Sequence, residues 1–519
     1  MRKFLFMLIS LFILLIAIRE GFKVPVLSGL AGRDELVILQ GSLPDNLDPA
    51  RNSSFDNALP LSGIYEGLVK LNPETLAPEP CLAESWDVSA DGKRWTFHLK
   101  AGIKFSDGTA CDAEAIKSSM SRSMVLKESQ PYSALVFNPV ASIESEGRHT
   151  ISFALKYPFA PFLKNLALPF AAPVVSPRAL SKYGDQFWKH PSGTGPYMLR
   201  KFGVNEIVLQ ANPLYREGSV SPGAIVFRGV PDSSDRTMYL LNGKADIVFY
   251  PGREKLNIIQ DRGMKIMTRP GVDVSYLGFY TDKPPFNNKF LRKAVAYSLD
   301  REKIVAKALG GDGVPATGIV PPPVLSGKTV KMPKYSQDQV RRILAREGYP
   351  AGFDVTLITY QDTRRYCPPG GRELAEEIKR QLEPAGIRVS IQSRPWEEHK
   401  QAIRDKTGHF FLYGWTGDNG DADNFLYTLL ASTQAGRGLN ASGYRNSRLD
   451  VFLITARSVA DLKSRDLLYE QAENIVLDEA PVTAINHGIV RIAYHPGISD
   501  IHLSGFGLID LFAITKIKK

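Results

Sequence analysis

A strand, a helix and a second strand follow one another in the later part of the chain, and this unit restricts the fold more than any other stretch. The apolar pattern predicts strands over Asp354–Thr359 and Ile387–Ile391, with a helix over Glu373–Leu382 between them. Pro384 and Gly386 end that helix. Two strands joined through a helix pair in parallel within one sheet. The sequence therefore predicts an α/β fold with some parallel pairing.

The size and composition of the chain predict a globular protein of several domains. At 519 residues the chain is too long for one hydrophobic core, so two or three domains are expected. A hydrophobic content of 44% and a charged content of 23% exclude disordered and fibrous classes. The net charge of +10 is spread along the chain, which argues against a nucleic-acid partner. A solvated surface that faces anionic lipid headgroups is the simpler account.

The N-terminal segment 1–33 has the pattern of an export signal. Arg2 and Lys3 precede the apolar run Phe4–Ile18, and Arg19 follows it. The run has fifteen residues, which is short of the roughly 20 that span a bilayer comfortably. We therefore expect export to the periplasm or the outer face of the cytoplasmic membrane. Cleavage of the segment and its retention as a signal anchor both stay open.

A β-hairpin is predicted in the first third of the chain. Leu82–Trp86 leads into a strand, Ala90–Gly92 turns, and Arg94–Lys100 alternates as the second strand. Asp-Gly between alternating strands is the strongest short-range hairpin signal. Asp112 is a fitting N-cap for the helix that follows.

A long helix is predicted from Asn288 to Leu309. Leu291, Val295 and Leu299 recur on one side of it at helical spacing. The pattern predicts one continuous helix with a buried face.

The cysteines are odd in number. Cys81 and Cys111 flank the predicted hairpin on opposite sides, so a disulfide between them is one of two open readings in an oxidising compartment. The sequence does not supply the Cα separation that a disulfide needs. Cys367 would then be a lone thiol. No CxxC or His spacing accompanies any of the three, so neither a metal site nor a cofactor is expected.

Several segments, taken in chain order, resemble one family. Leu82–Thr109, which contains the hairpin, is similar to the signature segment of the extracellular solute-binding proteins that serve peptide and nickel ABC transporters. The resemblance covers nearly all of the chain from about Glu35 onward. The other matching segments are Pro191–Tyr197, Leu241–Asp246, Pro285–Ile304, Gly313–Ala316 and Pro321–Pro322.

The resemblance implies a two-lobed periplasmic-binding-protein-like fold of type II, with mixed sheets, helices and a hinge between the lobes. It further implies an extra domain inserted into the first lobe. The expected division is a discontinuous lobe I from residues 34–66, 190–280 and 488–519, an inserted domain from 67–189, and lobe II from 281–487.

The stretch Gly414–Leu426 holds the strongest candidate site residues. Asp418, Asp421 and Asp423 stand among glycines and asparagines directly after the apolar run Phe410–Tyr413. Carboxylates in such a loop satisfy turn amides in many proteins. The calcium-loop spacing of an EF-hand and its distal Glu are absent from this sequence.

The resemblance gives Asp418 a specific role. In the family, the Asp of a Gly-Trp-x-x-Asp loop pairs with the ammonium of a bound peptide, and here that Asp follows Trp415. Trp415, Thr416 and Gly417 belong to the same ligand-facing stretch, although core packing is the alternative for Trp415. The loop matches that of the dipeptide-binding branch of the family except at Ala422, which replaces a Pro. The resemblance therefore favours the dipeptide-binding branch. Asp421 and Asp423 are expected to serve the turn.

The resemblance also implies an arginine for the peptide carboxylate. Counting back from the helix near Glu373 places Arg365 at the matching position. Tyr366 and Cys367 depart from the family segment, so Arg364 is a rival. Together with Asp418, this arginine would hold the two charged ends of a short peptide.

The resemblance implies a monomeric binding protein without catalysis. It would capture di- or oligopeptides at the membrane surface and deliver them to ABC permease subunits. Nickel chelates, haem or another non-peptide solute are alternatives within the family, but His399, His409 and the other histidines form no evident cluster. A secreted hydrolase is disfavoured because the nucleophile-elbow and zinc-protease motifs are absent from the sequence.

Overall fold

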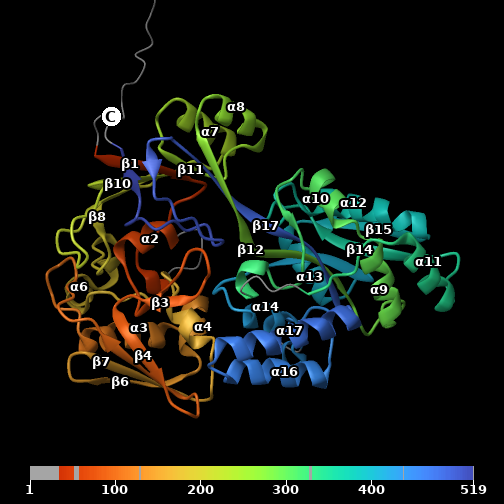
Figure 1. Ribbon diagram of the computed structural model, residues 1–519, viewed down its shortest axis with the longest axis horizontal. Helices are drawn as coiled ribbons and strands as arrows, with labels where there is room; N and C mark the ends of the chain where they lie inside the picture. Colours follow the sequence, from red (N-terminus) through yellow and green to blue (C-terminus); the bar gives the residue numbers. More distant parts are fainter. Residues whose placement is uncertain (1–33, 52–57, 128–129, 326–329, 436–437, 518–519) are drawn as a thin grey trace, which may run out of the picture.

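The structure, a computed structural model, describes residues 34–51, 58–127, 130–325, 330–435 and 438–517. Within these residues a sheet of eleven strands runs through both halves of the molecule (Figure 1). Its order is β15-β14-β16-β12-β17-β11-β1-β10-β9-β8, and β13 pairs with β17 beside this path. Two strands in the middle of this order therefore join the halves.

These two strands are β12 (Lys265–Phe279) and β17 (Val482–Tyr494), which are antiparallel. Figure 1 shows them crossing diagonally from one half of the molecule to the other. Their register shifts between Pro270 and Val274. At the shift, a Cβ on Gly271 would lie 3.0 Å from the Gly488 carbonyl oxygen, so the close approach of the two strands favours glycine.

The predicted strand–helix–strand unit is confirmed in one half. β14 (Phe353–Tyr360) pairs in parallel with β15 (Ile387–Arg394), and α12 (Gly371–Leu382) connects them. After α12, Gly386 adopts the left-handed conformation, with φ of +81°, and ends the helical segment. On the other side, β14 pairs with β16 (Phe410–Thr416), also in parallel.

In the other half, three parallel strands lie side by side. β1 (Glu35–Gln40) pairs with β10 (Ala224–Gly229) on one side and with β11 (Ile247–Phe249) on the other. Parallel strands end at the same edge of a sheet, so their carboxyl ends meet there. β9 (Glu206–Ala211) and β8 (Tyr197–Phe202) extend this half as antiparallel strands.

The predicted hairpin belongs to a separate four-stranded sheet of order β4-β5-β7-β6. Its hairpin strands β4 (Ala83–Val88) and β5 (Arg94–Leu99) are antiparallel. The predicted cap of the next helix, α3 (Ala113–Leu126), is confirmed, because the Asp112 carboxylate accepts the Ala115 N–H at 3.2 Å. This sheet is completed by β6 (Val140–Glu146) and β7 (Thr150–Leu155).

The single helix predicted from Asn288 to Leu309 is wrong. The chain forms two helices, α9 (Lys289–Ser298) and α10 (Arg301–Lys307). The Asp300 carboxylate accepts the Lys303 N–H at 3.1 Å and caps the second helix, which ends the first.

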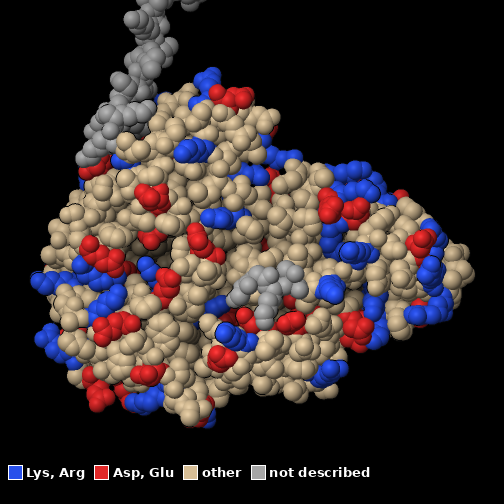
Figure 2. All heavy atoms as spheres, in the orientation of Figure 1, with Lys and Arg blue, Asp and Glu red and all other residues tan. Residues whose placement is uncertain are grey.

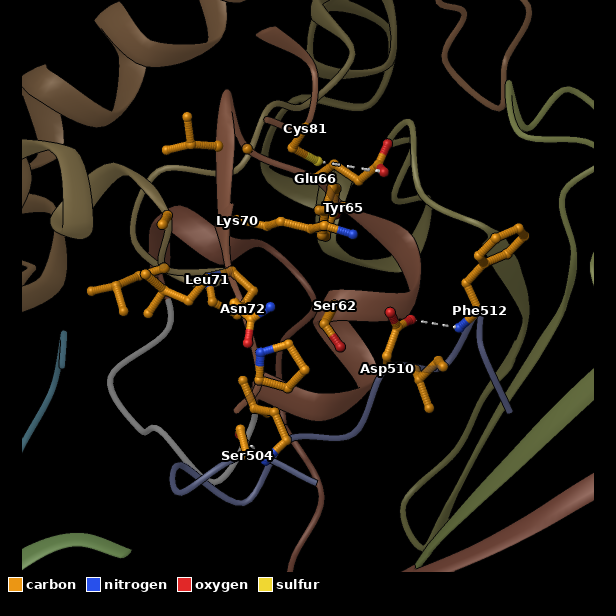
Figure 3. A pocket seen from close by; sticks show the side chains of 18 of the residues that line it. Ser62, Tyr65, Glu66, Lys70, Leu71, Asn72, Cys81, Ser504, Asp510 and Phe512 are labelled. Atoms are coloured by element: carbon orange, nitrogen blue, oxygen red, sulfur yellow. Dashed lines mark hydrogen bonds between the residues drawn. The ribbon is translucent and has the colours of Figure 1, made fainter. Parts of the chain in front are cut away.

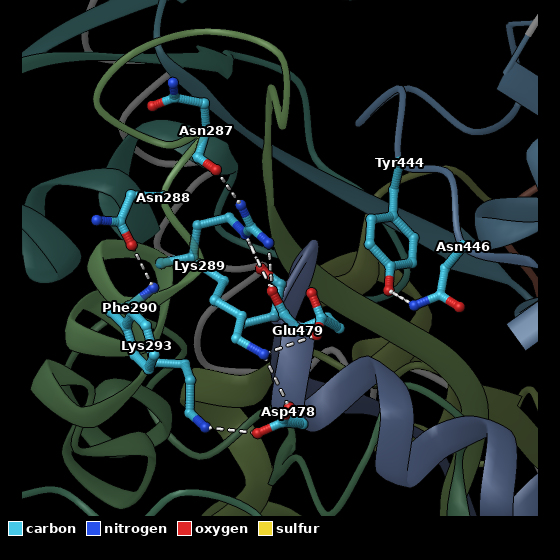
Figure 4. Close-up of polar contacts among 11 residues, drawn as sticks. Asn287, Asn288, Lys289, Phe290, Lys293, Tyr444, Asn446, Asp478 and Glu479 are labelled. Carbon is cyan, nitrogen blue, oxygen red and sulfur yellow. Dashed lines mark hydrogen bonds and ion pairs between the residues drawn. The ribbon is translucent and has the colours of Figure 1, made fainter. Parts of the chain in front are cut away.

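Lysines of α9 tie that helix to the end of α17 (Leu462–Glu479), which leads directly into β17 (Figure 4). The Lys289 ammonium lies 2.8 Å from the Glu479 carboxylate, and the Lys293 ammonium lies 2.9 Å from that of Asp478. These contacts fix the start of one of the two crossing strands.

Short strands and further α-helices complete the fold (Figure 1). The strands are β2 (Val69–Leu71), β3 (Pro78–Pro80), β13 (Val314–Pro315), β18 (Ile498–Ser499) and β19 (Thr515–Lys516). The helices are α2 (Ala58–Ile64), α4 (Pro131–Phe137), α5 (Phe162–Leu166), α6 (Pro177–Tyr183), α7 (Ser233–Leu241), α8 (Leu256–Asp261), α11 (Gln337–Arg346), α13 (Trp396–Arg404), α14 (Asp423–Leu430), α15 (Ser432–Ala435) and α16 (Ser447–Ser458).

The surface carries charges of both signs. Figure 2 shows Lys and Arg interspersed with Asp and Glu over the visible face. No helix in the described part of the chain is long and apolar enough to cross a membrane. The predicted export segment, 1–33, lies outside the described residues.

The three cysteines are free thiols in the structure, and all are buried. The disulfide between Cys81 and Cys111 that the sequence left open is therefore not formed. The Cys81 thiol lies 3.7 Å from a carboxylate oxygen of Glu66. Burial, reinforced by Glu66, raises the pKa of Cys81 to about 12. Burial likewise raises the pKa of Cys367 to about 12.

Thiol titration checks this arrangement. We expect a thiol reagent to leave Cys81, Cys111 and Cys367 unmodified in the native protein at neutral pH, because each is buried and protonated. All three should react in denaturant without any reductant. If only one thiol reacts in denaturant, Cys81 and Cys111 are bonded to each other and the structural assignment is contradicted.

Candidate functional site

The predicted ligand-facing stretch lies at the end of β16, beside the strand crossing. Trp415 pairs with Val274 and Thr416 with Asp273 across the antiparallel β16–β12 ladder. The Gly417 N–H continues the ladder by donating to the Val272 carbonyl at 2.8 Å. A side chain on Gly417 would come within 2.8 Å of the same oxygen, so glycine is needed there. The end of β16 is thus held rigidly against β12.

Asp418 is the first residue beyond this ladder, and it is partly buried. Its N–H donates to the Asn424 side-chain oxygen at 3.3 Å, and the Trp415 indole N–H donates to the same atom at 2.7 Å. No Lys or Arg nitrogen of the described residues lies within 4 Å of the Asp418 carboxylate. The loop therefore presents this carboxylate without a close cationic partner from the described chain.

The charge environment of Asp418 favours its neutral form. Burial raises the pKa of its carboxyl to about 6. A hydrogen bond from Asn424 opposes the rise, Asp273 adds to it, and Arg365 opposes it more weakly. A cation placed beside this carboxyl would favour its ionised form, so the site is suited to bind one.

Asp273 is a site residue that the sequence reasoning missed. It lies on β12 opposite Thr416, and its exposed fraction is only 2%. One of its carboxylate oxygens lies 3.8 Å from Nε of Arg365. The sequence signal was an acid inside the apolar run of a strand, between Val272 and Val274. Asp273 therefore connects the Asp418 loop electrostatically to Arg365.

The two arginine candidates point in different directions. Nη2 of Arg365 donates to the Phe506 carbonyl at 3.0 Å and to the Tyr250 hydroxyl at 3.3 Å. The Arg364 guanidinium instead stacks on the Trp396 ring, 3.5 Å from its centroid. Arg365 thus reaches from one half of the molecule to the other, and Arg364 packs within its own half.

Arg365 lines a cavity of about 240 Å³ between the two halves. The opposite wall comes from the segments that follow β1, β10 and β11, where the three carboxyl ends meet. The C-terminal segment supplies Phe506, Gly507 and Leu508. The lining contains no residue of 414–418. Ligands of open α/β sheets bind at such carboxyl edges, so the cavity is a natural extension of the site.

Asp421 does more than serve the turn. Its carboxylate accepts the Asp423 N–H at 3.0 Å, as a turn residue would. It also accepts two N–H groups from Arg465, at 2.8 and 2.9 Å, and both side chains are buried. Burial alone would raise the pKa of Asp421, but Arg465 and Lys164 lower it below its ordinary value.

Asp423 is also buried and paired. Nε of Arg457 lies 3.1 Å from its carboxylate. Burial still raises the pKa of Asp423 to about 6 against the effect of Arg457. The interpretation of Asp421 and Asp423 as turn residues is therefore incomplete, because each has an arginine partner from a later helix.

Residues of the predicted inserted domain hold the same loop. The Lys164 ammonium donates to the Gly420 carbonyl at 2.5 Å. The Asn419 side-chain amide donates to the Asn165 side-chain oxygen at 2.6 Å. The loop that carries Asp418 is thus fixed from both sides of the molecule.

A second cavity, of about 190 Å³, adjoins the first (Figure 3). It is formed by the end of α2, the segment after it and the C-terminal segment around Phe512. Glu66 at its edge accepts a hydrogen bond from Cys81 (Figure 3). Phe506 and Leu508 separate this cavity from the first, since both residues line both cavities. Its lining includes none of the predicted site residues.

The histidines do not build a metal centre within the described residues, where no group of three or more His, Cys, Asp or Glu could hold a metal ion. His399 is buried in an aromatic cluster that includes Trp396 and Tyr413. Burial lowers its pKa to about 4. Nδ1 of His409 accepts the Thr356 N–H at 2.9 Å.

Comparison with known proteins decides the family. The model of the bacterial extracellular solute-binding proteins, family 5, matches residues 77–437. The chain belongs to family 5 of the bacterial extracellular solute-binding proteins. These are extracytoplasmic, two-lobed binding proteins of ABC transporters, and they are not enzymes.

Individual relatives of this family 5 protein agree. The glutathione-binding protein GsiB of Escherichia coli O1:K1 / APEC is 30% identical over 461 residues, which cover 86% of this chain and 88% of that protein. HbpA2 from Haemophilus parasuis has a TM-score of 0.87 at 24% identity, covering 93% of this chain and 100% of that one. A dipeptide-binding protein from Pseudoalteromonas sp. SM9913, in complex with Met-Leu, has a TM-score of 0.73 at 26% identity, with the same coverage.

The raised pKa of Asp418 in this family 5 protein predicts a stability gain on substitution. Because the folded-state pKa is about 6 and the ordinary pKa of an Asp carboxyl is 3.8, the contribution of this group to stability is complete below pH 3.8 and is lost as the pH rises through 6. Asp418→Asn should therefore stabilise the unliganded protein at pH 8, on the order of 1 kcal/mol after allowance for solvent screening.

Urea denaturation of both proteins at pH 8 and pH 4 measures this effect. The gain should disappear at pH 4, where the wild-type carboxyl is already protonated. A loss of stability for Asp418→Asn at pH 8 that disappears at pH 4 would show instead that the charged form of Asp418 is stabilised by the fold.

Proposed function

We propose that this family 5 binding protein captures a di- or oligopeptide between its two lobes and delivers it to an ABC permease, without catalysing a reaction. The observation that carries the proposal is the grouping of Asp418, Asp273 and Arg365 beside the strand crossing. A zwitterionic peptide has an ammonium at one end and a carboxylate at the other, whatever its side chains are. Acids and an arginine in one site match both constant features.

Asp418 is the proposed partner of the peptide ammonium. It has no close cation from the described chain, and burial raises its pKa to about 6. A bound ammonium would supply the missing charge and lower that pKa. Charge-assisted hydrogen bonds are the strong ones in a water-poor cleft. Trp415, Thr416 and Gly417, at the rigid end of β16, form the proposed adjoining wall.

Arg365 is the proposed partner of the peptide carboxylate. Its guanidinium contacts Tyr250 and Phe506 of the other half, so a ligand bound there would contact both lobes at once. Arg364 is proposed to support the site from behind, because its guanidinium stacks on Trp396. A ligand that bridges the lobes favours their closure over it, which is the transport-competent form we propose.

Glutathione belongs to the same ligand class. A relative with 30% identity is a glutathione-binding protein, and glutathione is a tripeptide with one ammonium and two carboxylates. Nickel chelates and haem are the alternative ligands. A bare metal ion is less favoured as the ligand, because the described residues contain no group of three or more His, Cys, Asp or Glu that could hold one.

The proposed partners are ABC permease subunits at the membrane surface, which a monomer would approach from outside the cytoplasm. The net charge of +10 would draw the protein toward anionic headgroups. Residues 1–33 are proposed to direct export, either as a cleaved signal or as an anchor.

Ligand binding should depend on Asp418 and on pH. We expect Ala-Ala and glutathione to raise the thermal midpoint. At a hundredfold excess over Kd, the bound ligand adds about 2.7 kcal/mol to the free energy of unfolding. Asp418→Asn should weaken binding at pH 8 by about ten- to a hundredfold, as expected for loss of one charge-assisted hydrogen bond. Wild-type affinity should fall as the pH drops through about 6, because the carboxyl becomes neutral.

Asp423→Asn is the matched control, since its carboxyl is buried in the same loop and also has a pKa of about 6. Isothermal titration calorimetry should give this variant nearly wild-type affinity. Equal losses in both variants would mean that the loop, and not the Asp418 charge, is responsible. A shift with nickel or haem but none with any peptide would refute the peptide assignment.

A further inference from the structure

The cavity that Arg365 lines has a second arginine on its opposite wall. Arg236 lies on α7, the helix that follows β10, and it is 5% exposed. Its Nε donates to the Phe249 carbonyl at 2.9 Å and its Nη2 to the Tyr250 carbonyl at 2.9 Å. Its Nη1 donates to the carbonyls of Val230 and Pro231 at 2.6 and 2.8 Å. Arg236 thus joins the loops that follow β10 and β11.

The positive charge of Arg236 is not neutralised at close range. All four hydrogen-bond partners are neutral carbonyls, and no carboxylate of the described residues lies within 4 Å of the guanidinium. Asp232, at the N-terminus of the same helix, acts only over a longer distance. An arginine has five N–H donors, so one N–H of Nη2 has no hydrogen bond within the described residues. A buried charge of this kind is normally paired.

Gly41 leaves the guanidinium accessible from the cavity. Gly41 follows β1, is exposed and lines the same cavity. Among the described residues, a Cβ built on it would have one neighbour within 4 Å, Nη1 of Arg236 at 3.8 Å. Gly41 therefore borders Nη1 at the edge of the guanidinium, and a larger side chain at this position would narrow the approach to the guanidinium from the cavity.

The charge of the whole cavity points to an anion. Its lining contains Arg236 and Arg365 and, among the described residues, no Asp or Glu. The acids of the site, Asp418 and Asp273, do not line this cavity. A volume of about 240 Å³ exceeds what one carboxylate needs. Guanidinium groups bind carboxylates through paired N–H donors, which fits two arginines facing one space.

We propose that this cavity is an anion subsite in which Arg236, together with Arg365, takes a second carboxylate of the ligand. The protein would then select short peptides that carry an acidic group in addition to the terminal carboxylate. The inference rests on the proposed function, because it assigns a second contact to the same peptide. Gly41 is the residue that keeps the subsite open.

Two dipeptides that differ by one charge test the subsite. Ala-Glu and Ala-Gln have nearly the same shape, but only Ala-Glu has a side-chain carboxylate. By isothermal titration calorimetry at pH 8, we expect Ala-Glu to bind the wild-type protein about tenfold or more tightly than Ala-Gln, as a charge-assisted contact would give. Replacing Arg236 risks unfolding the loops that it joins, so the decisive variant is placed at Gly41.

Gly41→Val should bring the affinity ratio of the two dipeptides close to one, because its side chain narrows the approach to the guanidinium while Arg236 keeps its carbonyl contacts. Gly41→Ala adds only a Cβ at ordinary contact distance and should retain most of the preference. Unchanged thermal midpoints for both variants establish that the loops are intact.

The outcomes separate this inference from the proposed function. If both dipeptides bind the wild-type protein equally, the subsite is refuted and the peptide-binding function stands. If Gly41→Val retains the full preference for Ala-Glu, the acid is recognised elsewhere and the subsite is also refuted. If neither dipeptide binds, the proposed function fails and the subsite fails with it.

Discussion

The antiparallel pairing of β12 with β17 is the constraint on which the rest of the structure depends. These two long strands belong to both halves of the central sheet, so the halves are joined where the strands approach closely at Gly271 and Gly488. Both acids of the proposed site are placed by this crossing. Asp273 lies on β12 itself, and β16, which ends at Asp418, pairs with β12. Small changes at the crossing would therefore alter the site and the relation of the lobes together.

The acids near the crossing differ in whether a cation compensates for their burial. Asp421 is fully buried and paired by two hydrogen bonds with Arg465, which stabilises the loop. Asp418, three residues earlier, has hydrogen bonds but no close cation among the described residues, and its pKa is raised. A carboxyl that the unliganded fold disfavours in its charged form is typical of a functional position. The loop is thus stabilised by one acid so that another can remain available.

The sequence predicted local structure well and long-range contacts poorly. The strand–helix–strand unit and the hairpin depend on neighbouring residues, so periodicity and turn residues were sufficient. The apolar spacing alone predicted one continuous helix through Asp300. In the structure the Asp300 carboxylate caps a second helix, so the first helix ends before it. The family motif identified Asp418 and Arg365 as candidates. Asp273 contacts Arg365, and Arg236 contacts Phe249 and Tyr250 as well as its neighbours Val230 and Pro231; only the folded sheet brings the distant partners together.

A crystal structure of the protein with bound Ala-Glu tests the central claim most directly, because it measures which groups contact each end of the peptide. We expect the ammonium within hydrogen-bond distance of the Asp418 carboxylate and the terminal carboxylate on Arg365, with the peptide beside the β12–β17 crossing. A peptide bound in the cavity of about 190 Å³ near Phe512, or one with its ammonium away from Asp418, would contradict the account.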